Sequence, residues 1–258
     1  MMMVKYCGLS ISVLLTLGGV ASAAPATVPV AAGDFWMGAD DGADDEGPVH
    51  PVQVGEFWID THEVTNARYR ECVEAQVCRS PALTISRHRP DYFWDAKFAD
   101  YPVIFVSWQQ ADAFCRFAGG RLPTEAEWEK AARGPAPSLN TYPWGDTLPD
   151  CEHANMAGCI GDTDGVGRRP LGQSPYGVMD MAGNVWEWVA DWYDARYYQA
   201  VPLTDPQGPG DGTLKVMRGG CWESGAQLLR VSCRRAEIPR AWADNVGFRC
   251  VYDARGGR

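Results

Sequence analysis

The chain has 258 residues, of which 28 are glycine, 18 are proline and 11 are tryptophan. This composition favours a loop-rich fold pinned by aromatic side chains over a helical bundle, in one large domain or two small ones. The formal net charge of −10 argues against a nucleic-acid partner, because phosphate binding requires clustered Lys and Arg side chains.

The first 23 residues have the pattern of a secretion signal. Lys5 supplies a positive charge, an apolar run extends from Cys7 to Val20, and Ala21-Ser22-Ala23 is typical of a cleavage site. The run is too short for a membrane anchor and no second long apolar stretch follows. We therefore expect an exported protein, periplasmic or secreted, with no membrane anchor after cleavage. The expected organisation is a signal peptide at 1–23, a linker at 24–32, one domain at 33–253 and a tail at 254–258.

Hydrophobic periodicity and capping residues predict the first elements after the linker. Alternating apolar residues predict a strand over residues 52–59 that is interrupted near Gly55. Thr65 or Asn66 is placed to cap a helix that runs to about Ala75.

Two capping boxes predict the next two helices. Ser107 with Gln110 begins a helix that ends before Gly119-Gly120. Thr124 with Glu127 begins another helix, which closes at Gly134. Short apolar runs predict further strands at residues 103–106, 230–235 and 248–252.

The cysteines suit an oxidising compartment. Of the nine, Cys7 lies in the expected signal, which leaves an even number. No Cys-x-x-Cys pair occurs, so a zinc ribbon has little support. Free buried thiols are the alternative for any one cysteine. Short loops favour three disulfides, Cys72–Cys78, Cys151–Cys159 and Cys221–Cys233.

The segment 183–188, Gly-Asn-Val-Trp-Glu-Trp, places the carboxylate of Glu187 between two indoles. The indoles should lie in a packed core, where a carboxylate is costly unless a cation or several hydrogen bonds satisfy it. Together with Asp180 and the carbonyls of Gly183 and Val185, it offers the oxygen ligands that calcium prefers. The alternative is a capped turn in which Glu187 is hydrogen-bonded to the backbone.

Four sequence blocks resemble a known family in content and order. With Phe35-Trp36-Met37-Gly38 and residues 63–66 (Glu-Val-Thr-Asn), they are similar to the formylglycine-generating enzyme family, also called the sulfatase-modifying factor domain, over the whole mature chain. The resemblance implies a single α+β domain, rich in loops and related to the C-type lectin fold, with a disulfide between Cys115 and Cys250. The blocks are 120–129 (Gly-Arg-Leu-Pro-Thr-Glu-Ala-Glu-Trp-Glu), 183–188, 218–220 (Arg-Gly-Gly) and 247–250 (Gly-Phe-Arg-Cys).

The resemblance also implies two structural calcium sites. Asp180 occupies a ligand position at which many members carry asparagine, and this substitution keeps an oxygen donor. The pattern Asp-Thr-Asp-Gly at residues 162–165 alone is also that of an ordinary turn, which is the alternative for the second site. The first set is Asp180, Gly183, Val185 and Glu187; the second is Asn155 and Asp164 with the carbonyls of Met156 and Val166.

Members of the family that make formylglycine bind copper(I) through two cysteines after the Gly-Gly block, since soft thiolates suit that metal. The matching positions here are Ser224 and Leu229, so we expect no copper-cysteine chemistry. A displaced copper pair at Cys221 and Cys233 is the alternative to their disulfide. The candidate cleft, with an ordinary surface loop as its alternative, comprises Trp222, Glu223, Ser224 and Gln227.

Three functions stay open on this basis. The first is an exported family member with an oxidative or maturation role toward an envelope peptide or small molecule. The second is a non-enzymatic, lectin-like module that binds a peptide or glycan, and the third is a formylglycine-generating oxidase that uses displaced cysteines. No residue is assigned a catalytic role, and the substrate and oligomeric state are not predicted. The four histidines are expected to be scattered over the surface, and the alternative is that they bind non-haem iron together. They are His50, His62, His88 and His153.

Overall fold

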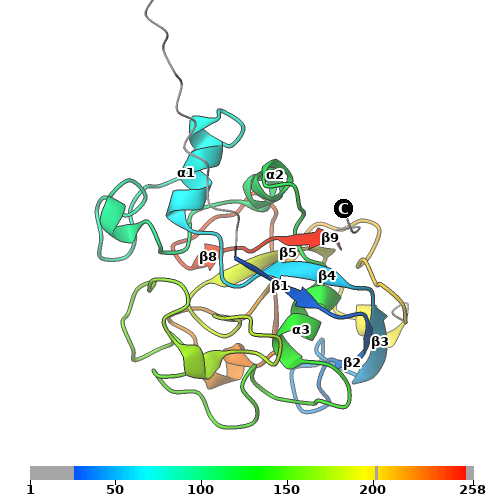
Figure 1. The fold of residues 1–258 in the computed structure, drawn as a ribbon. Coiled ribbons are helices and arrows are strands. Elements are labelled where there is room, and N and C mark those ends of the chain that lie inside the picture. Colours follow the sequence, from blue (N-terminus) through cyan, green and yellow to red (C-terminus); the bar gives the residue numbers. More distant parts are fainter. Residues whose placement is uncertain (1–25, 201–202, 254–258) are drawn as a thin grey trace, which may run out of the picture.

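Among the residues that the structure describes, 26–200 and 203–253 of a computed structural model, the strands form three small sheets. The first sheet has the order β1 (Thr27–Val30), β4 (Phe57–Asp60) and β9 (Val251–Asp253), all antiparallel. Figure 1 shows these strands side by side, in blue, cyan and red. The first and last strands of the described residues thus lie in one sheet. The expected signal peptide and tail lie outside the described residues.

The other two sheets frame the interior. The strands β2 (Gly33–Met37) and β3 (His50–Val54) form an antiparallel pair. The largest sheet has the order β7 (Arg234–Glu237), β6 (Lys215–Arg218), β5 (Trp186–Trp192) and β8 (Val246–Gly247), in which β5 and β8 run parallel. The break between β3 and β4 falls at Gly55-Glu56, as the sequence predicts.

The three α-helices of the described chain begin where the sequence predicts. They are α1 (Asn66–Glu74), α2 (Trp108–Phe117) and α3 (Glu125–Arg133), with Thr65, Ser107 and Thr124 as their N-caps. Both predicted capping boxes are formed. Short 3-10 turns occur at η1 (Ala96–Phe98), η2 (Pro170–Gly172), η3 (Tyr197–Gln199) and η4 (Ala226–Leu229). Few helices with mixed sheets confirm the α+β class.

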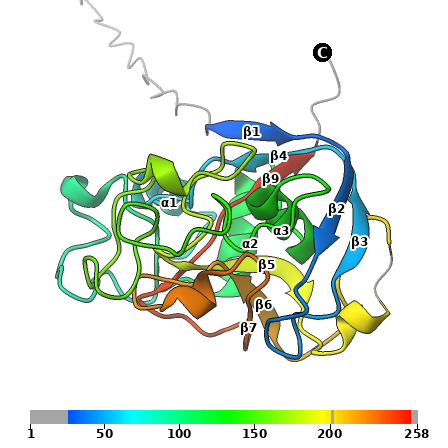
Figure 2. The same ribbon diagram turned by 90° about the horizontal axis from the view of Figure 1, so that it is seen from below.

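The helix α3 is the interior element of the fold. Every one of its residues is buried, and it packs against β2, β3, β5 and β6. Figure 2 shows α3 within the molecule, with β4 above it and β5 below. The Lys130 ammonium on α3 donates to the carbonyls of Ala31, Gly33 and Val54 at 2.8, 2.8 and 3.2 Å. This contact fastens the N-terminal strands to the core.

Four element predictions differ from the structure. Residues 27–30 form β1 and are not part of a linker, since their backbone pairs with β4. Residues 103–106 form no strand, because Phe105 has φ of 57° and the backbone bonds of this run go to separate loops, Val103 to Val64 and Phe105 to Ala243. The two final strands begin later than predicted. In the first of them a turn, closed by Cys233 N–H to Arg230 C=O at 3.0 Å, precedes β7.

Three of the four expected disulfides are present: Cys72–Cys78, Cys115–Cys250 and Cys151–Cys159. The fourth is wrong, since Cys221 and Cys233 are free and buried. Arg218 of β6 pairs with Arg234 of β7, and this register extended by one residue places Cys233 opposite Gly219. Cys221 lies two residues beyond Gly219, so it does not lie opposite Cys233. The short sequence separation of the two cysteines therefore did not lead to a disulfide.

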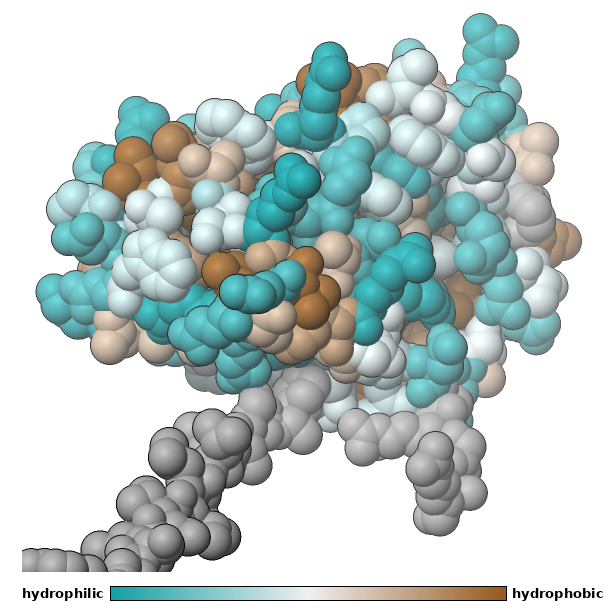
Figure 3. Space-filling view, turned by 90° about the horizontal axis from the view of Figure 1, so that it is seen from above, coloured by the Kyte–Doolittle hydropathy of each residue, from teal (hydrophilic) through white to brown (hydrophobic). Residues whose placement is uncertain are grey.

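The described part of the chain contains no helix that is both long and apolar enough to span a bilayer. The face of the molecule shown in Figure 3 is mostly hydrophilic, with hydrophobic side chains in small separate groups. Scattered apolar groups of this size are ordinary for a protein surface.

Candidate functional site

The carboxylate of Glu187 on β5 is held by a guanidinium. Arg249 donates from Nε and Nη2 to the two carboxylate oxygens, each at 2.7 Å, and the Trp128 indole donates to Oε2 at 2.9 Å. All three side chains are buried. The sequence left a cation or several hydrogen bonds as partners of this carboxylate, and in the structure the guanidinium of Arg249 supplies both the opposite charge and hydrogen bonds. The parallel register that sets Gly247 beside Glu187 brings Arg249 into reach.

Two further acids surround this ion pair, and one of them, Glu63, was not singled out as a site residue from the sequence. Asn184 donates to Oε1 of Glu63 at 2.9 Å, whereas Oε2 is buried without a hydrogen-bond partner. Burial raises the pKa of Glu63 well above its usual value, and the charges of Asp180 and Glu187 raise it further. Burial also raises the pKa of Asp180, whose Oδ2 accepts from the Gly167 N–H at 2.6 Å.

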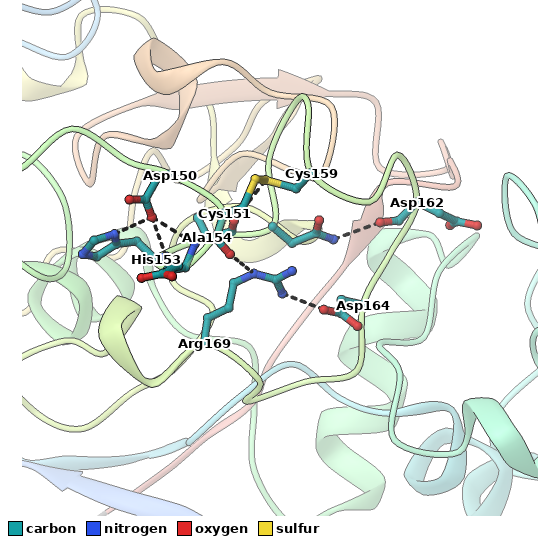
Figure 4. The surroundings of a disulfide bond; sticks show 10 residues. Asp150, Cys151, His153, Ala154, Cys159, Asp162, Asp164 and Arg169 are labelled. Atoms are coloured by element: carbon teal, nitrogen blue, oxygen red, sulfur yellow. Dashed lines mark hydrogen bonds and ion pairs between the residues drawn. A yellow bond between two sulfur atoms is a disulfide. The ribbon is translucent and has the colours of Figure 1, made fainter.

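The second predicted calcium set is partly occupied by arginine. Asp164 accepts from Arg169 at 2.8 Å and from Arg168 at 3.3 Å, and Figure 4 shows the Arg169 side chain reaching toward it from beside the Cys151–Cys159 disulfide. The carbonyl of Met156 accepts from the Cys159 N–H at 3.1 Å. Asn155 differs, because its Oδ1 is buried and has no hydrogen-bond partner.

Asn184 joins the two predicted calcium sets into one network. Its Oδ1 accepts from the Asp164 N–H at 2.8 Å and from Asn155 Nδ2 at 3.2 Å, and its Nδ2 reaches Glu63. Gly183 lies beside this network at φ of 86°, and a Cβ there would collide with the Asn155 carbonyl. The glycine therefore permits the close approach of the two segments.

The atoms that could bind a metal here are isolated side-chain oxygens and backbone carbonyl oxygens. No group of three or more His, Cys, Asp or Glu side chains in the described ranges could hold a metal ion. A cation in this region would therefore also need carbonyl oxygens, such as those of Gly183 and Val185. The buried, unpartnered Oε2 of Glu63 and Oδ1 of Asn155 are oxygens that a hard cation could use.

The two positions where the copper-binding cysteines would stand carry no thiolate. Ser224 is buried, its Oγ accepts from the Cys221 N–H at 3.0 Å and lies 3.4 Å from the Cys221 sulfur. Leu229 is fully buried in a cluster with Tyr142, Ala154 and Ala182. Burial raises the pKa of Cys221 and raises that of Cys233 to about 11, so both nearby thiols are protonated at neutral pH.

Residues 18–254 match the model of the sulfatase-modifying factor enzyme 1-like domain. The chain belongs to this family. The formylglycine-generating enzyme of Streptomyces coelicolor is 36% identical over 278 residues, which cover 86% of this chain and 87% of that enzyme. The inactive C-alpha-formylglycine-generating enzyme 2 of Mus musculus is 32% identical over 281 residues, covering 89% of this chain and 86% of that protein.

A longer relative also contains the domain. The serine/threonine-protein kinase pkn1 of Chlamydia pneumoniae is 38% identical over 236 residues, covering 87% of this chain and 37% of that protein, so this chain spans little more than a third of its length. Among solved structures, PvdO from Pseudomonas aeruginosa has a TM-score of 0.74 at 28% identity over 89% of this chain and 95% of its own. Treponema denticola variable protein 1 has a TM-score of 0.71 at 24% identity, covering 88% of this chain and 95% of its own, and this likeness shows the fold alone.

The sequence blocks of the sulfatase-modifying factor family lie mainly in the interior of this protein. Arg218 of the Arg-Gly-Gly block forms buried ion pairs with Glu125 and Glu129 of α3. It also donates to the carbonyls of Val231 and Ser232. These contacts connect β6, α3 and the segment before β7, so the block has a structural role that does not depend on the missing cysteines.

The four residues of the candidate cleft do not share one open surface. Trp222 and Ser224 are buried, whereas Glu223 and Gln227 are exposed. The Trp222 indole donates to the Asp244 carbonyl at 3.4 Å, and Glu223 accepts from Asn245 at 2.6 Å. Only the two exposed members could contact a ligand without rearrangement of the loop.

Proposed function

We propose that this chain is an exported member of the sulfatase-modifying factor family that has kept the fold and lost the copper-cysteine chemistry. Its role would lie in the modification or maturation of an envelope peptide or small molecule. The observation that carries this proposal is the filling of both copper positions, by the hydrogen-bonded Ser224 and by the buried Leu229. Neither side chain is a thiolate, and Leu229 offers no ligand atom at all.

The neighbouring cysteines do not replace the missing pair. Copper(I) needs two sulfurs in one coordination sphere, and the thiolate is the form that binds. The raised pKa values of the Cys221 and Cys233 thiols favour the protonated form, and Cys221 is already in contact with Ser224. The third function considered from the sequence, formylglycine generation through displaced cysteines, is therefore disfavoured.

The test is an aerobic incubation of the full chain with a peptide containing Cys-x-Pro-x-Arg, with and without copper, followed by mass spectrometry. We expect no conversion of cysteine to the aldehyde above the protein-free control. A copper-dependent conversion that the Cys221→Ser variant abolishes would overturn the proposal.

A gain-of-binding experiment sharpens this test. The double variant Ser224→Cys with Leu229→Cys restores sulfur at both family positions, and we expect it to bind copper(I) in competition with a chelator. Each single variant is the matched control and should not. If the unmodified chain competes for copper(I) as well as the double variant does, the assignment of the missing pair is wrong.

We also propose that calcium supports this fold. Glu63, Asp180 and Glu187 lie close together, only Glu187 of the three forms an ion pair with Arg249, and Oε2 of Glu63 has no partner. Burial raises the pKa of Glu63 and of Asp180, so a divalent cation would displace protons from these carboxyls and balance the charge of their ionised forms. It would be held by Glu63 and Asp180 with the carbonyls of Gly183 and Val185. The second predicted calcium site, which contains Asn155, has fewer free ligand atoms, because Asp164 is already paired with two arginines.

A non-enzymatic binding module is the second candidate function. The two exposed cleft residues, Glu223 and Gln227, support it, because both can contact a ligand without rearrangement of the loop. Export to the envelope is common to both candidates and rests on the first 23 residues. Detection of the chain in the periplasm or medium, with its N-terminus near residue 24, would test that part.

A further inference from the structure

A cavity of about 590 Å³ lies apart from the copper positions and from both predicted calcium sets. Its walls come from the turn after α1, from the first turns of α2 and from residues 240–242. The volume falls within the range of pockets that hold small molecules. Of the wall residues, Ser107 and Gln110 cap α2 and Cys78 forms a disulfide, and these contacts shape the cavity.

The cavity carries two unpaired positive charges. The side chains of Arg79 and Arg240 are exposed, and neither forms an ion pair or hydrogen bond with any residue that the structure describes. The lining contains no Asp or Glu, although the whole chain has a formal net charge of −10. Two guanidinium groups that face a shared cavity without a carboxylate favour an anionic ligand.

The wall that bears Arg79 is fixed in place. The amide of Gln110 on α2 donates to the carbonyls of Arg79 and Ser80 at 3.3 and 2.9 Å, and the Tyr69 hydroxyl also donates to the Arg79 carbonyl, at 2.9 Å. The preceding residue, Cys78, is bonded to Cys72 of α1. The backbone that carries this guanidinium is therefore organised before any ligand arrives.

The opposite wall is fixed by backbone contacts. The Trp108 N–H donates to the Pro239 carbonyl at 3.0 Å, and the Ala241 N–H donates to the Ile238 carbonyl at 2.9 Å, so Arg240 lies in a closed turn. A preformed site loses less conformational entropy on binding than a mobile loop does.

Trp242 adds a flat aromatic surface to the cavity. Its ring meets Phe105 edge to face, with centroids 5.8 Å apart, yet 47% of the residue is exposed. An indole that is anchored on one edge and open on the other can stack on a ring of a ligand. The cavity thus combines a stacking surface with two donors for an oxyanion.

We propose that this cavity binds a small aromatic oxyanion, a molecule with one flat ring and a phosphate or carboxylate group. Arg79 and Arg240 bind the oxyanion through their N–H groups, and Trp242 stacks on the ring. The first turn of α2 lies in the same wall and adds a favourable dipole. Binding here needs neither copper nor calcium, and it is independent of the function proposed above.

The probe is phenyl phosphate, titrated into the full chain and followed by calorimetry, with inorganic phosphate and phenol as partial probes. We expect phenyl phosphate to bind at least about tenfold more tightly than either part. Benzoate distinguishes a carboxylate ligand from a phosphate ligand. Equal binding of phenol and phenyl phosphate, or no binding of phenyl phosphate or benzoate at millimolar concentration, would refute the proposal.

Variants locate the site. The double variant Arg79→Gln with Arg240→Gln should weaken phenyl phosphate by about tenfold or more, and Trp242→Ala should weaken phenyl phosphate but leave inorganic phosphate unchanged. Arg196→Gln is the matched control, since Arg196 is exposed and its side chain has no charged partner in the described chain. These residues are on the surface, and unchanged melting temperatures would establish that the variants fold. Binding that survives the double variant would place the ligand elsewhere.

Discussion

Arg249 and Glu187 form a buried ion pair with two parallel hydrogen bonds, each of 2.7 Å. Glu187 lies in β5 and Arg249 lies between β8 and β9, 62 positions further along the chain. Trp128 of α3 donates a third bond to the same carboxylate. One carboxylate thus joins β5, α3 and the segment before β9 at the centre of the molecule, and its charge is balanced by a side chain.

Removal of the guanidinium should destabilise the protein strongly. In Arg249→Met the Glu187 carboxylate is left buried without its counter-charge, which typically costs about 3–5 kcal/mol. Urea denaturation at neutral pH measures this loss. The double variant Glu187→Leu with Arg249→Met should lose less than the single variant does, because the Glu187 carboxylate is then no longer buried without its counter-charge. Arg116→Gln, which breaks the exposed pair with Asp112, is the control and should change the free energy of unfolding by less than about 1 kcal/mol.

Local signals in the sequence predicted local structure well. The capping residues Ser107 and Thr124 fix where α2 and α3 begin, because each bonds a backbone N–H only three residues away. The disulfides Cys72–Cys78 and Cys151–Cys159 close short loops in the same way.

The failures concern contacts between distant segments. Pairing of Glu187 with Arg249 depends on strand register, which one sequence does not specify, so the sequence does not identify the guanidinium as the partner of this carboxylate. The same cause separates Cys221 from Cys233. The buried, unpartnered oxygen of Glu63 was missed because its position beside Asp180 and Glu187 arises only from the packed fold.

Calcium should raise the melting temperature. At a free calcium concentration about a hundredfold above the dissociation constant, linkage predicts an increase in the free energy of unfolding on the order of 3 kcal/mol. Thermal melts with calcium and with a chelator measure it. Glu63→Gln should reduce the difference between the two melts, whereas Glu223→Gln, an exposed carboxyl outside the set, should leave it unchanged. Identical melting temperatures with and without the chelator would show that calcium has no part in stability.

Thiol titration should find two free sulfhydryls in the chain from residue 26 onward. Cys221 and Cys233 are buried, and burial raises the pKa of both, so neither should react with a disulfide reagent in the native protein at pH 8. Both should react once the protein is denatured without reductant. The variant with Cys221→Ala and Cys233→Ala should then show no thiol signal. Absence of free thiols in the denatured, unreduced protein would mean that the two cysteines form a fourth disulfide after all.

Asp191 should make stability depend on pH. Burial and the negative charge of Glu125 raise the pKa of this carboxyl to about 8 in the folded protein, against about 3.9 when unfolded. The folded state therefore holds the proton more tightly, and the stability that this proton provides is complete at low pH and lost as the pH rises toward 8. Asp191→Asn keeps an oxygen to accept from the Glu125 N–H, at present 2.8 Å from the carboxyl, and has no charge to bury. The free energy of unfolding of the variant, relative to that of the natural protein, should rise by up to about 1.4 kcal/mol per pH unit between pH 5 and pH 8. Urea denaturation measures this difference. Asp211→Asn, at an exposed carboxyl, should show no such trend. A constant difference between Asp191→Asn and the natural protein across this range would mean that Asp191 stays ionised in the fold.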